Sequence, residues 1–97
     1  MIFEWDDHKN RSNIQKHHLS FDDVTGFFFD PFCLRKLDYR FDAEERWQAL
    51  GTSNGITIVL VAYSHRDDEN NEIIRLISAR KANSQERRTY EYGKKSH

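Results

Sequence analysis

The sequence is poor in the residues that build covalent or metal-based frameworks, with one cysteine, one proline and four glycines among 97 residues. A single cysteine excludes an intramolecular disulfide and any zinc site built from several cysteines. Cys33 stands between Phe32 and Leu34, and we interpret it as a small buried apolar residue rather than a reactive thiol. The chain also lacks a long uncharged run and a basic, then apolar N-terminus, which predicts a cytoplasmic protein without a membrane segment.

The common enzymatic motifs are missing as well. There is no phosphate loop, no G-x-G-x-x-G, no nucleophile elbow and no H-E-x-x-H. Among the five histidines, His17 and His18 are adjacent, so on a helix their side chains point about 100° apart and would chelate one metal poorly. We therefore expect no metal and no cofactor, and any catalysis must use dispersed side chains.

What the chain does contain is enough apolar surface for one core. Hydrophobic residues make up 37% and charged residues 32%, and the aromatic set comprises seven Phe, four Tyr and two Trp. That aromatic content argues against disorder, and a chain of this length rarely supports two cores. We expect a single domain over residues 1–97.

Charge is unevenly distributed along the chain. Residues 1–50 carry seven Lys and Arg against ten Asp and Glu, whereas residues 51–97 carry eight against six. From Ile73 onward seven basic residues face two acidic ones, a local balance of +5. Such a segment can bind phosphate, although solvated surface charge is the plainer interpretation.

The N-terminal part predicts a short strand or cap over residues 2–5 and then two helices. Asp6 or Asp7 can cap a polar helix that ends near His17, with Ile14 as its main apolar anchor. A second helix starts at Ser20 and ends at Asp30-Pro31, because the residue before proline disfavours the helical conformation. Its apolar residues at helical spacing are Phe21, Val24, Phe27 and Phe28, and we expect the cluster Phe27-Phe28-Phe29 to lie in the core rather than at a ligand site.

The remaining sequence predicts strands followed by a helix. The strand candidates are residues 33–37, 46–52, 56–63 and 73–79, joined by short polar turns. Short connections favour antiparallel neighbours, and Ser84 opens a last helix to about Tyr92, leaving residues 93–97 as a frayed tail. The predicted class is α+β, with two N-terminal helices, a roughly four-stranded antiparallel sheet and a C-terminal helix.

An ordered set of residues resembles the BrnT family of ribonuclease toxins from bacterial type II toxin–antitoxin systems. The set is Phe3-Glu4-Trp5-Asp6, Asn13 with Lys16-His17, Ser20-Phe21, Asp30-Pro31, Glu44-Glu45-Arg46, residues 77–82 (ISARKA), Glu86-Arg87 and Tyr90. It spans nearly the whole chain and is most specific around residues 77–90. One departure is His18, which stands where the family usually has a glycine, a residue suited to a left-handed helix C-cap.

The resemblance implies a RelE-like ribonuclease fold and RNA cleavage without a metal. It also implies inhibition of translation and growth, and a BrnA-type antitoxin whose ribbon-helix-helix domain binds DNA. DNA would then be contacted only through the antitoxin complex. Metal-free RNA cleavage needs a base for the 2′-hydroxyl, an acid for the leaving 5′-oxygen and cations near the phosphorus.

The last helix offers candidates for these roles. Glu86, Arg87 and Tyr90 fall within about 100° of arc, so they can face one site. Arg80 stands just before that helix. We expect Arg80, Glu86 and Tyr90 to be catalytic, with Arg87 binding substrate. The alternatives are structural: Arg80 as a salt bridge that orients the helix, Glu86 in an intrahelical pair with Arg87, and Tyr90 at the edge of the core.

Further candidates lie before this helix. Arg75 and Arg80 have opposite parity along an ideal strand, so both reach one site only if Arg80 lies beyond the strand's end. Arg66, in the preceding connection, and Lys81 are further candidates for substrate binding. His17 is the histidine that the family motif supports as a catalytic residue, and its alternative is a ring that caps the first helix or bonds to the backbone.

A different class of function explains the basic segment equally well. A non-catalytic module that binds nucleic acid or protein needs the arginines and lysines but tolerates loss of Glu86 and Tyr90, whereas a nuclease does not. A partner that only completes an antitoxin complex on DNA would tolerate loss of all of them.

Overall fold

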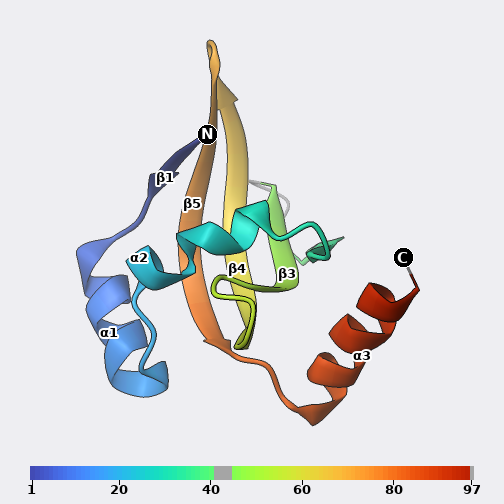
Figure 1. Ribbon diagram of the computed structural model, residues 1–97. Helices are drawn as coiled ribbons and strands as arrows, with labels where there is room; N and C mark the ends of the chain where they lie inside the picture. Colours follow the sequence, from blue (N-terminus) through green and yellow to red (C-terminus); the bar gives the residue numbers. More distant parts are fainter. Residues whose placement is uncertain (41–44, 97) are drawn as a thin grey trace.

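The computed structural model describes residues 1–40 and 45–96. Its centre is a five-stranded sheet in the order β1-β5-β4-β3-β2. The strands are β1 (Ile2–Glu4), β2 (Leu34–Leu37), β3 (Arg46–Thr52), β4 (Ile58–Asp68) and β5 (Asn71–Lys81). The helices are α1 (Asp7–His17), α2 (Phe21–Val24), a 3-10 helix (Thr25–Phe29) and α3 (Ser84–Lys95). Figure 1 shows α1 and α2 on one side of the sheet and α3 set apart at its other side.

The α+β class is confirmed, and the sheet differs from the prediction in one strand. β2 to β5 form the predicted antiparallel meander, but β1 adds a fifth strand that pairs in parallel with β5, Ile2 to Ile73 and Glu4 to Arg75. The sheet is therefore mixed, and the four-stranded antiparallel prediction was wrong in this respect. A three-residue segment whose partner lies about 70 residues later carries no local signal of its pairing.

The predicted first helix is confirmed, but its anchor is polar. Asp6 caps α1 by accepting from the backbone nitrogen of Lys9. Ile14 is 42% exposed, and the buried residue is Asn13. The Asn13 amide accepts from Ala79 N at 3.0 Å and donates to Ala79 O at 2.8 Å. It thus binds the backbone of β5 as a neighbouring strand would, and fixes α1 beside that strand.

The second helical segment supplies the core. Ser20 accepts from Asp23 N as the start signal predicted, and the backbone leaves the helical region at Asp30, before Pro31. After Val24 the coil tightens into the 3-10 helix, so the single predicted helix is two short pieces. Phe21, Phe27 and Phe28 pack into the core against β3, β4 and β5. Phe29 was also expected there, but it ends the 3-10 helix and is 74% exposed, so that part of the prediction was wrong. One face of the sheet is covered in this way.

β4 and β5 form a hairpin that is longer than predicted. The strands reach Asp68 and start again at Asn71, and Glu69 in the turn has a left-handed φ of 53°. Arg66 therefore lies on β4, paired with Ile73, and its placement in a connection was wrong. At the other end Ile56 precedes the strand and is 85% exposed. Residues 66–72 are all charged or polar, which explains why composition alone indicated a loop.

A β-bulge changes the faces of β5. Tyr63 pairs with Leu76 and Ala62 with Ser78, so Ile77 is the extra residue. Ile74, Leu76 and Ala79 consequently all point into the covered core. The same shift places Arg75 and Arg80 on one face although both lie within β5, which overturns the parity argument that required Arg80 to lie beyond the strand.

α3 begins with a capping box and runs three residues beyond the predicted end. The Asn83 side chain accepts from Glu86 N, and the Glu86 carboxylate accepts from Asn83 N. Residues 93–95, expected in a frayed tail, are helical. A small apolar cluster holds α3 to the sheet, formed by Leu50, Ile58, Ala82 and Tyr90.

Candidate functional site

The face of the sheet opposite α1 and α2 is the candidate site, and we call it the open face. Strand register defines it, because paired residues across a sheet point to the same side. One row across it contains Ser64, Arg75 and Glu4, and another contains Leu50, Leu60 and Arg80. The middle of the face carries the small residues Ala62 and Ser78. Charged groups therefore lie at both ends of the open face, and these small side chains lie between them.

Arg80 and Glu86 form a bidentate ion pair on this face. The guanidinium donates two hydrogen bonds to the carboxylate, Nη1 to Oε1 at 2.8 Å and Nη2 to Oε2 at 3.0 Å. The side chains are 39% and 22% exposed, so both reach solvent. This bidentate geometry links the end of β5 to the first turn of α3. It matches the structural alternative for Arg80 and also leaves a fixed positive group beside the open face.

The electrostatics of the pair follow from this contact. The hydrogen bond from Arg80 lowers the pKa of the Glu86 carboxyl despite partial burial, and the backbone nitrogen of Asn83 lowers it further. The pKa of Arg80 is raised by the same hydrogen bond. Both groups are therefore charged at neutral pH. Glu86 makes its ion pair with Arg80, so the predicted alternative of an intrahelical pair with Arg87 is not the one observed.

A second basic group lies at the hairpin end of the open face. Arg66 and Arg75 share one carboxylate oxygen of Glu4, at 2.8 Å and 3.4 Å. The hydrogen bond from Arg66 is the main cause of the lowered pKa of Glu4. The Arg75 row is separated from the Arg80 row by four residues along β4, about 13 Å at the rise of a strand. The two groups share a face but do not touch.

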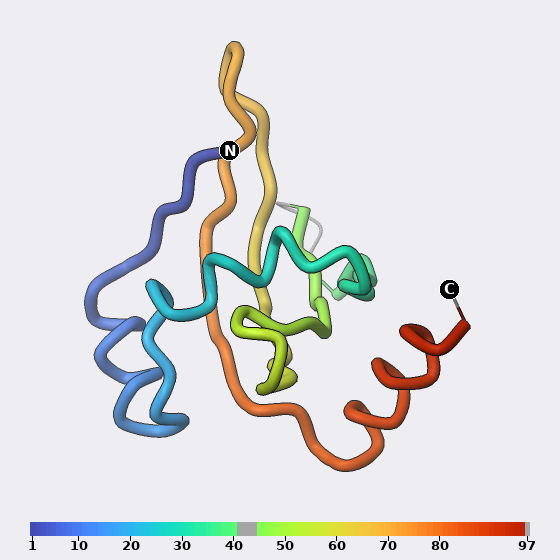
Figure 2. Tube along the Cα trace, in the orientation of Figure 1, coloured from blue at the N-terminus to red at the C-terminus, as the bar shows by residue number. Residues whose placement is uncertain are grey.

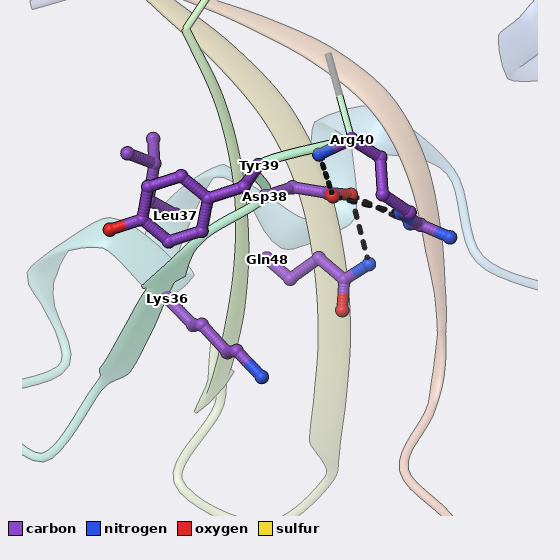
Figure 3. A pocket seen from close by; sticks show the side chains of 6 residues that line it. All are labelled: Lys36, Leu37, Asp38, Tyr39, Arg40 and Gln48. Atoms are coloured by element: carbon purple, nitrogen blue, oxygen red, sulfur yellow. Dashed lines mark hydrogen bonds and ion pairs between the residues drawn. The ribbon is translucent and has the colours of Figure 1, made fainter.

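Two hollows adjoin at Lys36 and Gln48, on the β2–β3 part of the open face. One, of about 250 Å³, runs between α3 and the sheet and includes Lys36, Gln48, Leu60, Glu86 and Thr89 in its lining. The other, of about 540 Å³, shares Lys36 and Gln48 with it and is completed by Leu37, Asp38, Tyr39 and Arg40. Figure 3 shows Asp38 between Arg40 and Gln48, with the Tyr39 ring turned outward. Together they form a path from Glu86 to the edge of β2.

Sequence reasoning missed these lining residues. Lys36 and Gln48 pair across β2 and β3 on the open face. Polar and apolar residues alternate over residues 46–49, but this pattern does not say which of the two faces stays uncovered, and residues 34–37 do not alternate. The 81% exposed ring of Tyr39 follows β2 and carries no pattern of its own.

Tyr90 lies on the inner side of α3 and is 2% exposed. Its hydroxyl donates to Oδ2 of Asp30 at 2.7 Å, and burial together with this carboxylate raises the pKa of Tyr90 to about 12. Asp30 also accepts from the backbone nitrogens of Phe32 and Thr52. Although burial opposes it, these hydrogen bonds lower the pKa of Asp30. The contact joins α3 to the end of the 3-10 helix and to β3.

The other predicted residues are placed around the lower end of the sheet. Arg87 donates to Ala82 O and Ser84 Oγ, at the start of α3. Lys81 pairs with Val59 and so points to the covered side rather than the open face. α1 continues from β1 in the direction of β5, which brings the half-buried His17 to the end where β5 finishes (Figures 1 and 2). Within the described residues the His17 ring makes no hydrogen bond.

His18 and Glu44 need separate mention. His18 is the C-cap of α1 and adopts the left-handed conformation, φ 59°, that suits the glycine it replaces. Glu44, part of the predicted motif, lies outside the described residues, whereas Glu45 immediately precedes β3. Over residues 1–40 and 45–96 no three His, Cys, Asp or Glu side chains gather as a metal site would require. In the same part of the chain no helix is long and apolar enough to span a membrane.

Comparison with known proteins agrees with this architecture. The family model described as the ribonuclease toxin BrnT of type II toxin–antitoxin systems matches residues 5–86. The crystal structure of the Brucella abortus ribonuclease toxin BrnT is similar at a TM-score of 0.64 and 30% identity, covering 87% of this chain and 100% of that one. No curated protein matches the chain. The family match covers most of the sequence and the structural match extends over the same fold, so the chain belongs to the BrnT family of ribonuclease toxins of type II toxin–antitoxin systems.

Proposed function

We propose that this chain is a metal-independent endoribonuclease that cuts RNA on the open face, inhibits translation and growth in the cytoplasm, and is neutralised by a protein antitoxin. The observation that carries the proposal is the Arg80–Glu86 pair. It holds the solvent-accessible guanidinium of Arg80 in a fixed position, and its Glu86 carboxylate lines the hollow beneath α3. Family membership supports the ribonuclease activity.

The reaction uses the RNA's own 2′-hydroxyl as the nucleophile. This oxygen loses its proton and attacks the adjacent phosphorus, and the bond to the 5′-oxygen breaks as that oxygen takes up a proton. The products are a 2′,3′-cyclic phosphate and a 5′-hydroxyl. Proximity of the 2′-oxygen to the phosphorus provides much of the rate, and a fixed guanidinium stabilises the charge that develops on the phosphoryl oxygens.

Each predicted residue takes a role consistent with its position. Arg80 faces the phosphoryl oxygens, and Glu86 holds Arg80 and accepts the 2′-proton. His17, at the same end of the sheet, donates a proton to the leaving oxygen. Tyr90 is a positioning residue in this scheme, because its buried hydroxyl is engaged by Asp30 and fixes the helix that carries Glu86.

Substrate binding extends over the rest of the open face. Arg66 and Arg75 lie together at the hairpin end of the open face, where they bind a phosphate further along the strand. Tyr39 offers an exposed ring for stacking an unpaired base. Arg87 and Lys81 flank the pair and contribute to the local field rather than to direct contacts. A single-stranded RNA, free or on the ribosome, fits such a path better than a duplex does.

The proposed inhibitor is a BrnA-type antitoxin with a ribbon-helix-helix domain. The antitoxin covers the basic segment of the toxin, which starts at Ile73. Within the complex only the antitoxin binds DNA. Membership of a type II family supports a protein inhibitor. Opposite charge on the two partners would raise the association rate and fix their register.

The test is cleavage of a fluorescent single-stranded RNA in EDTA, with the products identified by mass spectrometry. We expect a 2′,3′-cyclic phosphate and a 5′-hydroxyl. A DNA of the same sequence lacks the nucleophile and should stay intact, as should RNA with a 2′-O-methyl group at the cut site. A 5′-phosphate product, cleavage of DNA, or activity only after Mg²⁺ is added would overturn the proposal, since each requires an external nucleophile.

A non-catalytic binding module is the alternative that this assay excludes or establishes. If RNA binds in a salt-dependent manner but is not cut in the free or ribosome-bound form, the open face is a binding surface only. Retention of that binding in Glu86→Gln would strengthen this outcome, because a binder does not need the carboxylate.

A further inference from the structure

A second concave site lies on the opposite side of the sheet from the open face, at the hairpin end, and we call it the hairpin pocket. Its volume is about 190 Å³. The side chains that matter for its chemistry are the rings of Phe28, Trp47 and Tyr63 and the polar groups of Glu45, His65 and Glu72. None of them takes part in the proposed RNA site.

Strand register explains why these groups converge. Trp47 pairs with Tyr63 on the covered side of β3 and β4, and His65 follows Tyr63 two positions later on the same side. The long β4–β5 hairpin projects beyond the helices in Figure 1. The aromatic side chains of the core therefore continue along the hairpin beyond the part that the helices cover. There they line a pocket that is open to solvent.

Two carboxylates with spare acceptor capacity stand at the rim. Glu45 Oε1 accepts from Trp47 Nε1 at 2.8 Å, and Glu72 Oε1 lies 2.9 Å from His65 Nε2. The second oxygen of each carboxylate makes no hydrogen bond within the described part of the chain. The two glutamates are 50% and 48% exposed, so these oxygens face a ligand or water.

Among the described residues, carboxylates outnumber cations in the lining of the pocket and at the adjacent hairpin tip, five against the three of Arg35, Arg66 and the amino group of Met1. The hairpin tip next to Glu72 carries the exposed carboxylates of Asp67, Asp68 and Glu69. Arg35, an exposed cation of the lining, has its guanidinium 5.7 Å from the ring centroid of Phe28. A phosphate-bearing strand would be repelled by the carboxylates at the entrance, whereas a cationic group would be attracted.

We propose that the hairpin pocket binds an arginine side chain from a basic segment of a protein partner. A guanidinium is planar, so it can stack on the Trp47 ring while its nitrogens donate to the free oxygens of Glu45 and Glu72. A lysine can neutralise the same carboxylates but lacks the flat face and the fork of donors. This inference concerns a basic segment bound at the hairpin pocket, and it depends neither on RNA cleavage nor on the antitoxin contact proposed for the basic part of the molecule.

The experiment is a titration of the full chain, followed by NMR, with a blocked Gly-Arg-Gly-Arg-Gly peptide. We expect the indole N–H of Trp47 and the amide signals around His65 and Glu72 to shift, and signals at Arg80 and α3 to stay in place. A citrulline version of the peptide keeps the shape but loses the charge, and should bind at least about tenfold more weakly, as charge-assisted hydrogen bonds predict.

Matched variants separate the pocket from the general charge of the protein. Glu45→Gln and Glu72→Gln should each weaken binding of the arginine peptide by about tenfold. Glu91→Gln removes a carboxylate from α3 and should leave binding unchanged. Trp47→Phe keeps a ring for stacking and guards against a variant that merely fails to fold.

Several outcomes would overturn the assignment. They are equal binding of the citrulline peptide, equal losses in all three glutamine variants, and shifts of the pocket signals by adenosine monophosphate but not by the arginine peptide. The last would make this a nucleotide site. Because the readout is peptide binding, a failure of the ribonuclease proposal would not produce any of these results.

Discussion

The two faces of the sheet come from the same strands but have opposite properties. On the covered face, alternate residues of β3, β4 and β5 meet the aromatic rings of the 3-10 helix, and Phe27, Val61 and Ala79 are fully buried. On the open face, the intervening residues are small or charged, and α3 covers one end. The covered face supplies the free energy of folding, and the open face, which contributes less to it, is available for chemistry.

The bulge at Ile77 connects these two properties. Without the extra residue, the strand that buries Leu76 would place Ala79 on the open side and Arg80 in the core. With it, both Leu76 and Ala79 are buried while Arg75 and Arg80 share the open face. Because of this one extra residue, β5 packs apolar side chains into the core on both sides of the bulge. It also places both arginines on the open face.

The largest effect on stability is expected at the covered face. Phe27→Ala removes a fully buried ring that contacts Phe28, and should lower the free energy of unfolding by about 3–5 kcal/mol in chemical denaturation. The matched control is Phe29→Ala, two positions later, where the side chain is 74% exposed and the loss should stay below about 0.5 kcal/mol. Equal losses in the two variants would contradict the placement of the core.

A smaller loss is expected where α3 meets the covered segment. Tyr90→Phe leaves the Asp30 carboxylate without one of its donors, and should cost about 1–3 kcal/mol in the same measurement. Single-turnover cleavage by the folded variant should fall less than in variants of Arg80, because Tyr90 acts through the position of α3. Tyr92→Phe, at an exposed ring of the same helix, is the control and should change neither quantity. A full loss of cleavage in stable Tyr90→Phe would instead make Tyr90 a proton donor.

The ion pair of the open face should appear as a pH dependence. The folded-state pKa of Glu86 lies below its ordinary value of 4.5, so its contribution to stability is complete above that value and disappears as pH falls through the folded pKa. The difference in unfolding free energy between the parent and Glu86→Gln should therefore be largest near neutral pH and shrink below about pH 4. A difference that stays constant from pH 7 to pH 3 would contradict the pairing with Arg80.

The smallest expected change concerns the turn after α1. His18→Gly removes the strain of a side chain at φ 59° and should raise the free energy of unfolding by about 1 kcal/mol. His18→Asn should lie between the two, because asparagine tolerates this conformation better than most residues. A destabilised glycine variant would mean that the His18 side chain stabilises the turn.

Local signals in the sequence accounted for much of this architecture. The caps at Asp6 and Ser20, the stop before Pro31 and the strand over residues 46–52 were all readable from short patterns, because each depends on neighbours in the chain. The parallel pairing of β1 and the Asn13 contact with Ala79 were not, because both join residues more than 60 positions apart. The pattern of polar and apolar residues along β5 did not predict the bulge at Ile77.

The candidate site was predictable only in part. The sequence indicated that Arg80 and Glu86 belong together, since one precedes the last helix and the other lies in its first turn. It could not indicate that Tyr90 turns to Asp30, or that Lys81 points to the other side, because both depend on how α3 and β5 are placed in three dimensions. The hollow along Lys36 and Gln48 depends in turn on which face the helices leave open.

The most direct test of the account exchanges the charges of the open-face pair. Arg80→Glu combined with Glu86→Arg can keep the ion pair but removes the cation from β5, and the lost capping box should cost about 1 kcal/mol of stability. Single-turnover RNA cleavage in EDTA should fall at least about a hundredfold, as it should in Arg80→Ala. If the exchanged variant is folded and cuts RNA at the parent's rate, the pair only holds α3 in place, and the central claim of an active site at Arg80 is wrong.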